Sequence, residues 1–280
     1  MGRPMAERLI KAGHKLSLNR VRHASQHLVD LGADSCDTPK SVARAADIVI
    51  LMVPDTPDVE AVLFGKDGVA EGLTPGKLVI DMSSISPVAT KAFAERIASL
   101  GCDYLDAPVS GGEVGARNGT LSIMVGGGQA AFDRAMPLFE AMGKNITLVG
   151  GVGDGQTAKV ANQIIVALNI AAVAEALTFA KRAGADPRAV RQALMGGFAS
   201  SRVLEVHGER MIERTFDPGF RIALHRKDLG IATTTAHDLA LTLPNTTATQ
   251  QLMDTAIANG DGDQDHSALI KTLERLPNPT

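Results

Sequence analysis

The chain has 280 residues, which is enough for two domains. Its 45% hydrophobic and 21% charged residues are ordinary for a soluble globular protein, and a net charge of -3 argues against a nucleic-acid partner. The two cysteines, Cys36 and Cys102, are too few for a disulfide framework, so a reducing, cytoplasmic compartment is expected.

The first half of the chain alternates short apolar runs with helical patterns, which is typical of a parallel sheet flanked by helices. Two runs, 47–53 and 77–82, are almost continuously apolar, as expected of strands buried on both faces. Further strands are expected at 15–19, 104–107, 121–125 and 146–149. Helices are expected at 24–31, 87–100 and 129–142.

The pattern becomes wholly helical in the second half. A long helix rich in Ala, Ile and Val is expected over 156–184, with Gly184 as its C-cap. Its apolar stretch, 164–180, is interrupted by polar residues and is shorter than the about 20 residues of a membrane span, so we expect a buried helix and no membrane partner. Shorter helices are expected at 187–194, 202–213, 227–241, 246–259 and 266–276. The sequence therefore predicts an α/β domain over 1–151 and an all-helical domain over 152–280.

The first residues read like the tail of a dinucleotide-binding motif, in which a strand, the pattern G-x-G-x-x-G and a helix follow one another. Gly2 would be the third glycine, and Pro4 falls in the first helical turn, where its missing N–H does no harm. The alternative is that Met1 begins an ordinary helix of a protein without a nucleotide fold. The strand pattern downstream favours the first interpretation. We therefore expect the preceding strand and the first two glycines to be encoded upstream of Met1.

Three strand ends in the first half carry residues that suit a dinucleotide, because ligands of open α/β sheets bind outside the carboxyl ends of the strands. Asn19 and Arg20 follow the first of these strands. An acidic residue there would accept from the 2′-hydroxyl of NAD, whereas an arginine can pair with the 2′-phosphate of NADP, so Arg20 gives a weak preference for NADPH. A solvated surface arginine fits equally well. The other two strand ends are followed by residues 53–58 and 81–84, for which ordinary capped turns are the alternative.

The catalytic candidates are a glycine-rich loop and the start of the long helix. Ser110 is followed by Gly111 and Gly112 after a strand end, where a hydroxyl and open backbone N–H groups suit a carboxylate; a tight turn without a ligand is the alternative. Lys159 has mostly small and apolar helix neighbours, so we expect burial to lower the pKa of its ammonium into the range of a proton donor, although most lysines are simply solvated. Asn162 lies one helical turn later on the same face.

These segments, in this order, resemble the β-hydroxyacid dehydrogenase family, which includes 3-hydroxyisobutyrate dehydrogenase. The resemblance runs from Gly2 to near the C-terminus. It is closest to the branch that acts on tartronate semialdehyde, as judged from MVPDTP at 52–57, DMSSISP at 81–87, LMGGFASSR at 194–202 and LEVHGER at 204–210.

This resemblance implies a fold and an activity. The fold would be a Rossmann-type dinucleotide-binding domain, lacking its first strand, followed by an all-α domain built on the long helix. The reaction would be the reversible, NAD(P)H-dependent reduction of tartronate semialdehyde to glycerate. The alternatives are a dehydrogenase for another small β-hydroxy acid, such as 3-hydroxyisobutyrate, and a non-catalytic remnant that only self-associates.

The resemblance also implies roles for single residues. Lys159 would be the catalytic acid/base with Asn162 beside it, and the substrate carboxylate would be held by Ser110, Gly111 and Gly112. The residues implied for the cofactor site are Val53, Pro54, Asp58 and Ser84, with Lys227 reaching it from the helical domain.

Two further expectations concern partners and metals. The long apolar helix suits an intersubunit surface as well as an interdomain one, so a homo-oligomer through the helical domain is expected. His207, His225 and His237 show no ligand-like clustering along the sequence, and no metal is expected.

Overall fold

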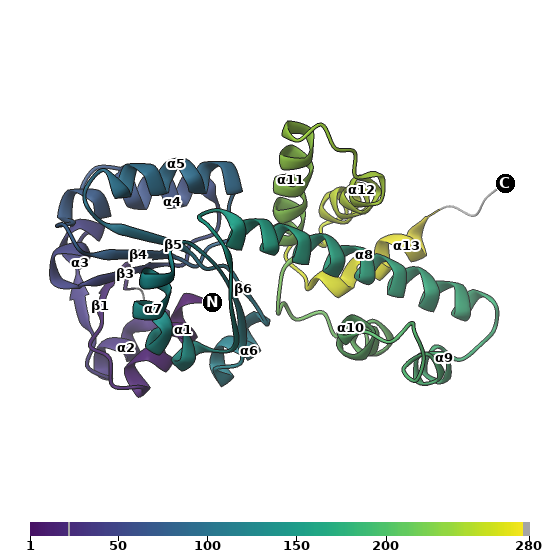
Figure 1. Cartoon of the computed structure of the whole chain (residues 1–280). Helices are drawn as coiled ribbons and strands as arrows, with labels where there is room; N and C mark the ends of the chain where they lie inside the picture. Colours follow the sequence, from purple (N-terminus) through teal and green to yellow (C-terminus); the bar gives the residue numbers. More distant parts are fainter. Residues whose placement is uncertain (22, 277–280) are drawn as a thin grey trace. The chain divides into compact units, whose positions relative to one another are not determined.

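The computed structural model describes residues 1–21 and 23–276, and it divides the chain into two compact units, Met1–Lys159 and Val160–Thr280. The first unit combines strands and helices, whereas the second is helical (Figure 1). The expected fold class, a Rossmann-like α/β domain followed by a helical domain with a long helix, is confirmed.

The strands of the first unit form two sheets. β1 (Ser17–Asn19) and β2 (Asp34–Cys36) pair in parallel as a two-stranded sheet. The larger sheet has the order β3-β4-β5-β7-β6, with β8 paired to β7. Its strands are β3 (Ile48–Leu51), β4 (Leu78–Asp81), β5 (Asp103–Asp106), β6 (Val109–Ser110), β7 (Leu121–Gly126) and β8 (Gly143–Gly150). Over 1–21 and 23–276, no strand joins β1 to β3, so the two sheets are separate.

The larger sheet is mixed, so the expectation of a parallel sheet is wrong for part of it. β3, β4 and β5 run parallel, and their carboxyl ends therefore meet at one edge. β7 runs antiparallel to both β5 and β6. The connections explain this, because parallel neighbours need a crossover of about a dozen or more residues. Residues 111–120, which separate β6 from β7, are too few for such a crossover, and β5 continues into β6 through residues 107–108 alone.

Helices cover both faces of the larger sheet (Figure 1). On one face α1 and α7 pack with Ile80 of β4 around a core that contains Phe139. On the other face α3, α4 and α5 pack with Val79 around a core that contains Phe93. The helices are α1 (Gly2–Lys11), α2 (Gln26–Asp30), α3 (Pro39–Ala45), α4 (Thr56–Phe64), α5 (Pro87–Ala98), α6 (Gly112–Asn118) and α7 (Gln129–Met142), with 3-10 turns at His23–Ser25 and Val69–Gly72. Because β4 contributes to both cores, it is buried on both faces, as its apolar run predicts.

The second unit is built around α8 (Asp154–Arg182), which begins in the first unit. Side chains from Ala167 to Leu177 form its core together with apolar residues of the surrounding helices. Those helices are α9 (Pro187–Leu194), α10 (Arg202–Glu213), α11 (Ile222–Asp238), α12 (Pro244–Ala258) and α13 (Leu269–Arg275), with a 3-10 turn at His266–Ala268. The expected start of α11 at residue 227 is wrong. The helix begins at Ile222, directly after Arg221, which is extended and bridged to Asp265.

Within the described part of the chain, α8 is the one helix that is long and apolar enough to cross a membrane. Its buried apolar side chains between Ala167 and Leu177 lie in the core of the second unit. A core helix that is apolar on most sides has this composition without any contact with lipid.

Candidate functional site

The loops that follow β3 and β4 are tied to each other by hydrogen bonds. The N–H of Val53 donates to Oγ of Ser83 at 3.0 Å, and the N–H of Ser86 donates to Oγ1 of Thr56 at 3.2 Å. Because β3 and β4 are parallel, both loops lie at the carboxyl edge of the sheet. The two segments from which the sequence predicts cofactor contacts, 53–58 and 81–84, are therefore held against each other at this edge.

The first turn of α8 is held against the ends of β4 and β5 by buried polar groups. Asp106, the last residue of β5, accepts hydrogen bonds from the N–H groups of Gly153 and Gln156, both at 2.8 Å, in the manner of a helix cap. The side chain of Gln156 accepts from the N–H of Ile85 at 3.1 Å and donates to the carbonyl of Ser83 at 2.8 Å. The sequence analysis gave no role to Asp106 or Gln156, although both lie in elements that it predicted, the strand at 104–107 and the long helix from 156.

α8 approaches the sheet so closely that residue 155 has to be glycine. A Cβ on Gly155 would lie 2.5 Å from the carbonyl oxygen of Met124 and 2.6 Å from that of Asp106, closer than real Cβ atoms come. Lys159 follows one turn later and is only 8% exposed. The lysine that the sequence singles out is therefore a largely desolvated ammonium on a helix anchored at the carboxyl edge of the sheet.

Two carboxyl groups are buried beneath this helix turn. Burial raises the pKa of Asp106 to about 6, and the nearby charge of Asp81 acts in the same direction, whereas hydrogen bonds from Gly153 and Gln156 act against it. The hydroxyl of Tyr104 donates to Asp81 at 3.3 Å, and burial raises the pKa of that hydroxyl well above its usual value. The hydrogen bonds that hold the first turn of α8 to Asp106 therefore depend on the protonation state of this carboxyl group.

The predicted carboxylate loop is the junction of β6 with α6, in which Gly111 is the N-cap of the helix and Gly112 its first residue. Ser110 ends the strand and is half-buried. Gly111 and Gly112 follow with φ values of 128° and 62°, a region that glycine enters at no steric cost. Ser110, Gly111 and Gly112 therefore lie together where β6 passes into α6, with no side chain on the two glycines to cover the backbone.

The other predicted cofactor residues of the first unit lie at the starts and ends of its elements. Gly2 begins α1, and a Cβ on it would lie 3.6 Å from Cβ of Met52, so the start of α1 adjoins the end of β3. Nδ2 of Asn19 donates to the carbonyl of Cys36 at 3.1 Å and so bonds to β2. Arg20 follows with a left-handed backbone and an exposed side chain.

In the second unit, two residues that sequence analysis missed connect Asn162 with Lys227. Nδ2 of Asn162 donates to Oε1 of Gln163 at 2.7 Å, and Nε2 of Gln163 donates to Oδ2 of the buried Asp228 at 2.5 Å. Nζ of Lys227 lies 2.8 Å from Oδ1 of Asp228. A carboxylate only accepts, so Gln163 turns its NH₂ group to Asp228 and its oxygen to Asn162. Sequence adjacency to Asn162 and Lys227 is the one signal that could have pointed to this pair.

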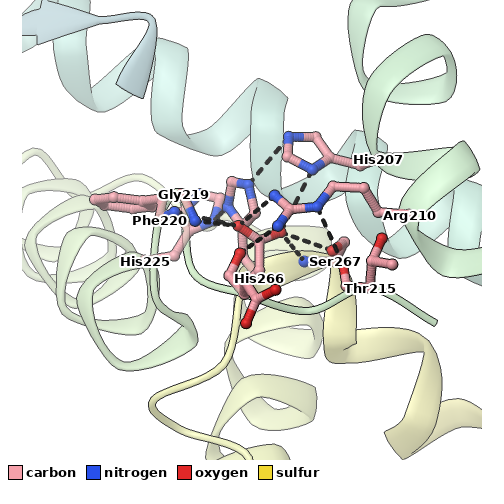
Figure 2. A network of polar contacts seen from close by, with 10 residues as sticks. His207, Arg210, Thr215, Gly219, Phe220, His225, His266 and Ser267 are labelled. Atoms are coloured by element: carbon pink, nitrogen blue, oxygen red, sulfur yellow. Dashed lines mark hydrogen bonds and ion pairs between the residues drawn. The ribbon is translucent and has the colours of Figure 1, made fainter. Parts of the chain in front are cut away.

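The expectation that the histidines do not cluster is wrong for His207 and His225. Both lie against His266, a residue that sequence analysis did not consider (Figure 2). His237 is 91% exposed and takes no part. Linear spacing gave no sign of the cluster of His207, His225 and His266. These residues come from α10, α11 and the 3-10 turn before α13, respectively.

Comparison with known proteins identifies both parts of the chain. Residues 1–151 match the family model described as the NAD binding domain of 6-phosphogluconate dehydrogenase. Residues 153–273 match the model described as NAD-binding of NADP-dependent 3-hydroxyisobutyrate dehydrogenase.

Relatives and solved structures agree with these matches. The chain is 63% identical over 278 residues to 2-hydroxy-3-oxopropionate reductase of Escherichia coli K12, covering 99% of this chain and 95% of that protein. It is 40% identical over 280 residues to the probable 3-hydroxyisobutyrate dehydrogenase-like 1, mitochondrial, of Arabidopsis thaliana. This match covers 99% of this chain and 84% of that protein. The structure of Mycobacterium tuberculosis 3-hydroxyisobutyrate dehydrogenase with L-serine has a TM-score of 0.90 at 31% identity, covering 99% of this chain and 96% of that one.

The resemblance read from the sequence is thereby confirmed over almost the whole chain. The fold, the two family matches and the relatives agree on a nicotinamide dinucleotide as the cofactor class. The chain therefore belongs to the β-hydroxyacid dehydrogenase family, of which 3-hydroxyisobutyrate dehydrogenase is a member, and is an NAD(P)-dependent oxidoreductase that acts on a CH–OH group.

Proposed function

We propose that this protein catalyses the NAD(P)H-dependent reduction of tartronate semialdehyde (2-hydroxy-3-oxopropanoate) to glycerate. The observation that carries the proposal is the 63% identity, over 99% of the chain, to a 2-hydroxy-3-oxopropionate reductase. The buried Lys159 supports it, because the reduction of an aldehyde needs an acid near the carbonyl oxygen.

Lys159 acts as the general acid in this proposal. The reduced nicotinamide, when bound, supplies a hydride to the aldehyde carbon. Nζ of Lys159 donates a proton to the carbonyl oxygen as negative charge develops there, so the aldehyde becomes a primary alcohol and the lysine is left neutral. A positioned acid of this kind contributes about 10²–10⁴-fold to the rate. In the reverse direction the neutral lysine removes the same proton.

Asn162 and the turn after β6 hold the substrate. Nδ2 of Asn162 uses one of its two hydrogens on Gln163, so its Oδ1 and its second N–H are available to a substrate hydroxyl, and Oδ1 also to the lysine ammonium. Ser110, Gly111 and Gly112 bind the substrate carboxylate through the hydroxyl and the backbone N–H groups of the turn.

The cofactor site is the carboxyl edge of the sheet of the first unit. Arg20 at the end of β1 is exposed and can pair with a 2′-phosphate, which favours NADPH over NADH. The remaining contacts are proposed for Gly2, Asn19, Val53, Pro54, Asp58, Ser84 and Lys227. Titration of NADPH and NADH against the protein, followed by fluorescence, measures this preference. Equal dissociation constants would contradict the role of Arg20.

Substrate identity is tested with a panel of small semialdehydes and hydroxy acids under saturating cofactor. We expect the highest kcat/KM with tartronate semialdehyde. A higher value with the semialdehyde of 3-hydroxyisobutyrate would assign the protein to the second candidate, which the 40% identical relative favours. Nucleotide binding without turnover of any member would contradict the reductase, and oligomer formation without nucleotide binding would indicate a non-catalytic remnant.

We also propose that the protein is a cytoplasmic homo-oligomer assembled through the helical unit. α8 carries an exposed apolar stripe that includes Ile165, 60% exposed, and Phe179, 75% exposed. Cys36 and Cys102 are both free thiols, which fits a reducing compartment. Cell fractionation tests the cytoplasmic location, and light scattering at several protein concentrations tests the oligomeric state.

A further inference from the structure

Gln163 is a buried polar residue of α8 that is bonded both within its own helix and to α11. Only 4% of the residue is exposed. Its Oε1 accepts from Nδ2 of Asn162 at 2.7 Å, and its Nε2 donates to Oδ2 of Asp228 at 2.5 Å. Its main-chain oxygen lies 3.1 Å from Nε2 of His225, which precedes Asp228 in α11. Gln163 is therefore held to α11 through both its side chain and its main chain.

Asp228 determines which way the amide of Gln163 is turned. Asp228 is 3% exposed, and Nζ of Lys227 lies 2.8 Å from its Oδ1. A carboxylate accepts hydrogen bonds and donates none, so Nε2 of Gln163 faces it and Oε1 faces the other way. An amide oxygen also only accepts, so Asn162 turns its NH₂ group toward Gln163. The ion pair of α11 thus sets the orientation of the Asn162 amide through Gln163.

This orientation decides what Asn162 offers on its open side. The residue is half-buried, in contrast to Gln163. Its Oδ1 and the second hydrogen of Nδ2 are left for other partners. The terminal torsion of an asparagine is broad, so an amide without a fixed partner can turn over and exchange its oxygen for its NH₂ group. A group that approaches Oδ1 as a donor would then meet a second donor.

The two helices do not need Gln163 and Asp228 in order to pack. Apolar residues of both helices, such as Ile170 and Leu229, already lie in the core of the second unit. Burying a carboxylate and an amide is costly, and apolar residues of similar volume avoid this cost. A bonded polar network, in contrast, specifies one geometry. What the network specifies here is the direction of an amide that lies one turn after Lys159.

We propose that Gln163 is a positioning residue for the reduction, which transmits the orientation imposed by Asp228 to Asn162. Asn162 then presents Oδ1 and one N–H to the substrate in a fixed arrangement. The inference rests on the proposed function, in which Asn162 contacts the substrate. Both polar ends of the Gln163 side chain are bonded within the protein, so Gln163 acts on the reaction through Asn162 alone.

The first test measures the network in the unaltered protein. NMR of the ¹⁵N-labelled protein follows the exchange of side-chain NH₂ hydrogens with solvent. We expect the NH₂ group of Gln163 to exchange much more slowly than that of Gln192, an exposed glutamine of α9. Equal exchange rates would show that the network does not form and would overturn the proposal. No substrate is needed, so this result is independent of the proposed function.

Gln163→Met keeps the length of the side chain and removes its strong hydrogen-bonding groups. We expect kcat/KM for tartronate semialdehyde to fall at least about tenfold, because a small misplacement of a contact group can cost about 10²-fold. The dissociation constant of NADPH should not change, since Lys227 keeps its ion pair with Asp228. Gln192→Met makes the same change at an exposed site and is the control.

Two results for the folded Gln163→Met variant would overturn the proposal. One is a normal kcat/KM. The other is a loss of NADPH affinity as large as the loss of kcat/KM, which would place the effect at Lys227 rather than at Asn162.

Gln163→Glu separates a positioning role from a structural one, because its side chain can replace the amide in one protonation state only. A protonated carboxyl group donates to Asp228 through its O–H and accepts from Asn162 through its carbonyl oxygen, as the amide does. An ionised carboxylate cannot donate and adds a second negative charge beside Asp228. Burial and the charge of Asp228 raise the pKa of the introduced carboxyl group, whereas Lys227 acts in the opposite direction.

We expect kcat/KM of Gln163→Glu to recover toward the wild-type value as the pH falls from about 8 to about 5.5, the range in which a carboxyl group with a raised pKa gains its proton. Gln163→Met should show no such recovery. The titratable groups around the position are His225, Lys227 and Asp228 of α11 and Lys159 of α8. They are the same in both variants, so the ratio of the two activities removes their contribution.

An acid-side kcat/KM of Gln163→Glu that is no higher than that of Gln163→Met would overturn the proposal. A higher value at both ends of the range would support it, with the proton retained throughout. A wild type without activity on any semialdehyde would instead contradict the proposed function, and the exchange measurement would still show whether the network forms.

Discussion

Lys159 is an uncommon lysine because its side chain is almost wholly buried. Most lysines are solvated, and burying an ammonium is costly unless it is paired or used in chemistry. The sequence indicated burial from the small and apolar neighbours of Lys159 in the helix. The structure adds the reason why the lysine stays in place, since Asp106 and Gln156 anchor the preceding turn to the sheet.

Replacing Lys159 by Ala should remove most turnover but leave cofactor binding intact. The loss of a general acid predicts a fall in kcat of about 10²–10⁴-fold. Steady-state kinetics and NADPH titration measure the two effects on the same sample. Lys181→Ala, at an exposed lysine later in the same helix, is the matched control and should behave as wild type. Near-normal kcat in Lys159→Ala would remove this residue from the mechanism.

Arg20→Ala should weaken NADPH binding without affecting NADH. A single charge-assisted contact to the 2′-phosphate is worth about 1.4 kcal/mol if its loss costs tenfold in affinity. The ratio of the two dissociation constants is the quantity to measure, because a general disturbance of the site would change both. Lys144→Ala, at another exposed cation of the same unit, controls for the change in net charge. If the ratio does not change, Arg20 is a surface residue, which the sequence alone left open.

At the scale of elements, the junction between β5 and α8 is governed by the protonation of Asp106. Its pKa is raised to about 6 in the folded chain, mainly by burial, from an ordinary value of 3.8. Between about pH 4 and pH 6 the folded state therefore retains a proton that the unfolded state has released. The stability that this proton confers is complete below pH 4 and is lost as the pH rises through 6.

We expect Asp106 to lower the free energy of unfolding by about 3 kcal/mol between pH 4 and pH 7, the equivalent of a shift of about 2 pKa units. Urea denaturation of the wild type and of Asp106→Asn over this range isolates the contribution, because the variant cannot titrate at this position. The free energy of unfolding of the wild type should fall relative to that of Asp106→Asn as the pH rises from 4 to 7. A difference that does not vary with pH would mean that Asp106 titrates normally.

The elements that the sequence predicted well are those with a strong local signal. α9 and α10 have the predicted bounds because Asp186 and Ser201 cap their first turns. Of the elements that were missed, β2, β6 and α6 are short, so they carry too little periodicity to be recognised, and α3 and α4 were missed as well. For α3 and α4 a signal was present, since Thr38 and Asp55 each precede a proline at the start of the helix.

At the scale of the whole molecule, the exposed stripe on α8 is the feature that a second copy of the chain would cover. Phe179→Glu places a charge in this stripe and should shift the oligomer toward the monomer, because a buried, unpaired carboxylate is costly. Light scattering at matched concentrations measures the mass. Phe198→Glu, at a fully exposed phenylalanine outside α8, is the control and should keep the wild-type mass. A monomeric wild type would contradict the proposed assembly.

The sequence by itself determined the class of the fold, the family and the order of the main elements, because periodicity, caps and motif spacing are local properties of the chain. It also singled out Lys159, Asn162 and Ser110, which lie in recognisable motifs. Only the tertiary structure decided what surrounds them. Asp106 and Gln156 meet across 50 residues of chain, and His207 and His266 across 59. Such contacts depend on how separate elements pack, and linear spacing carries no record of that packing.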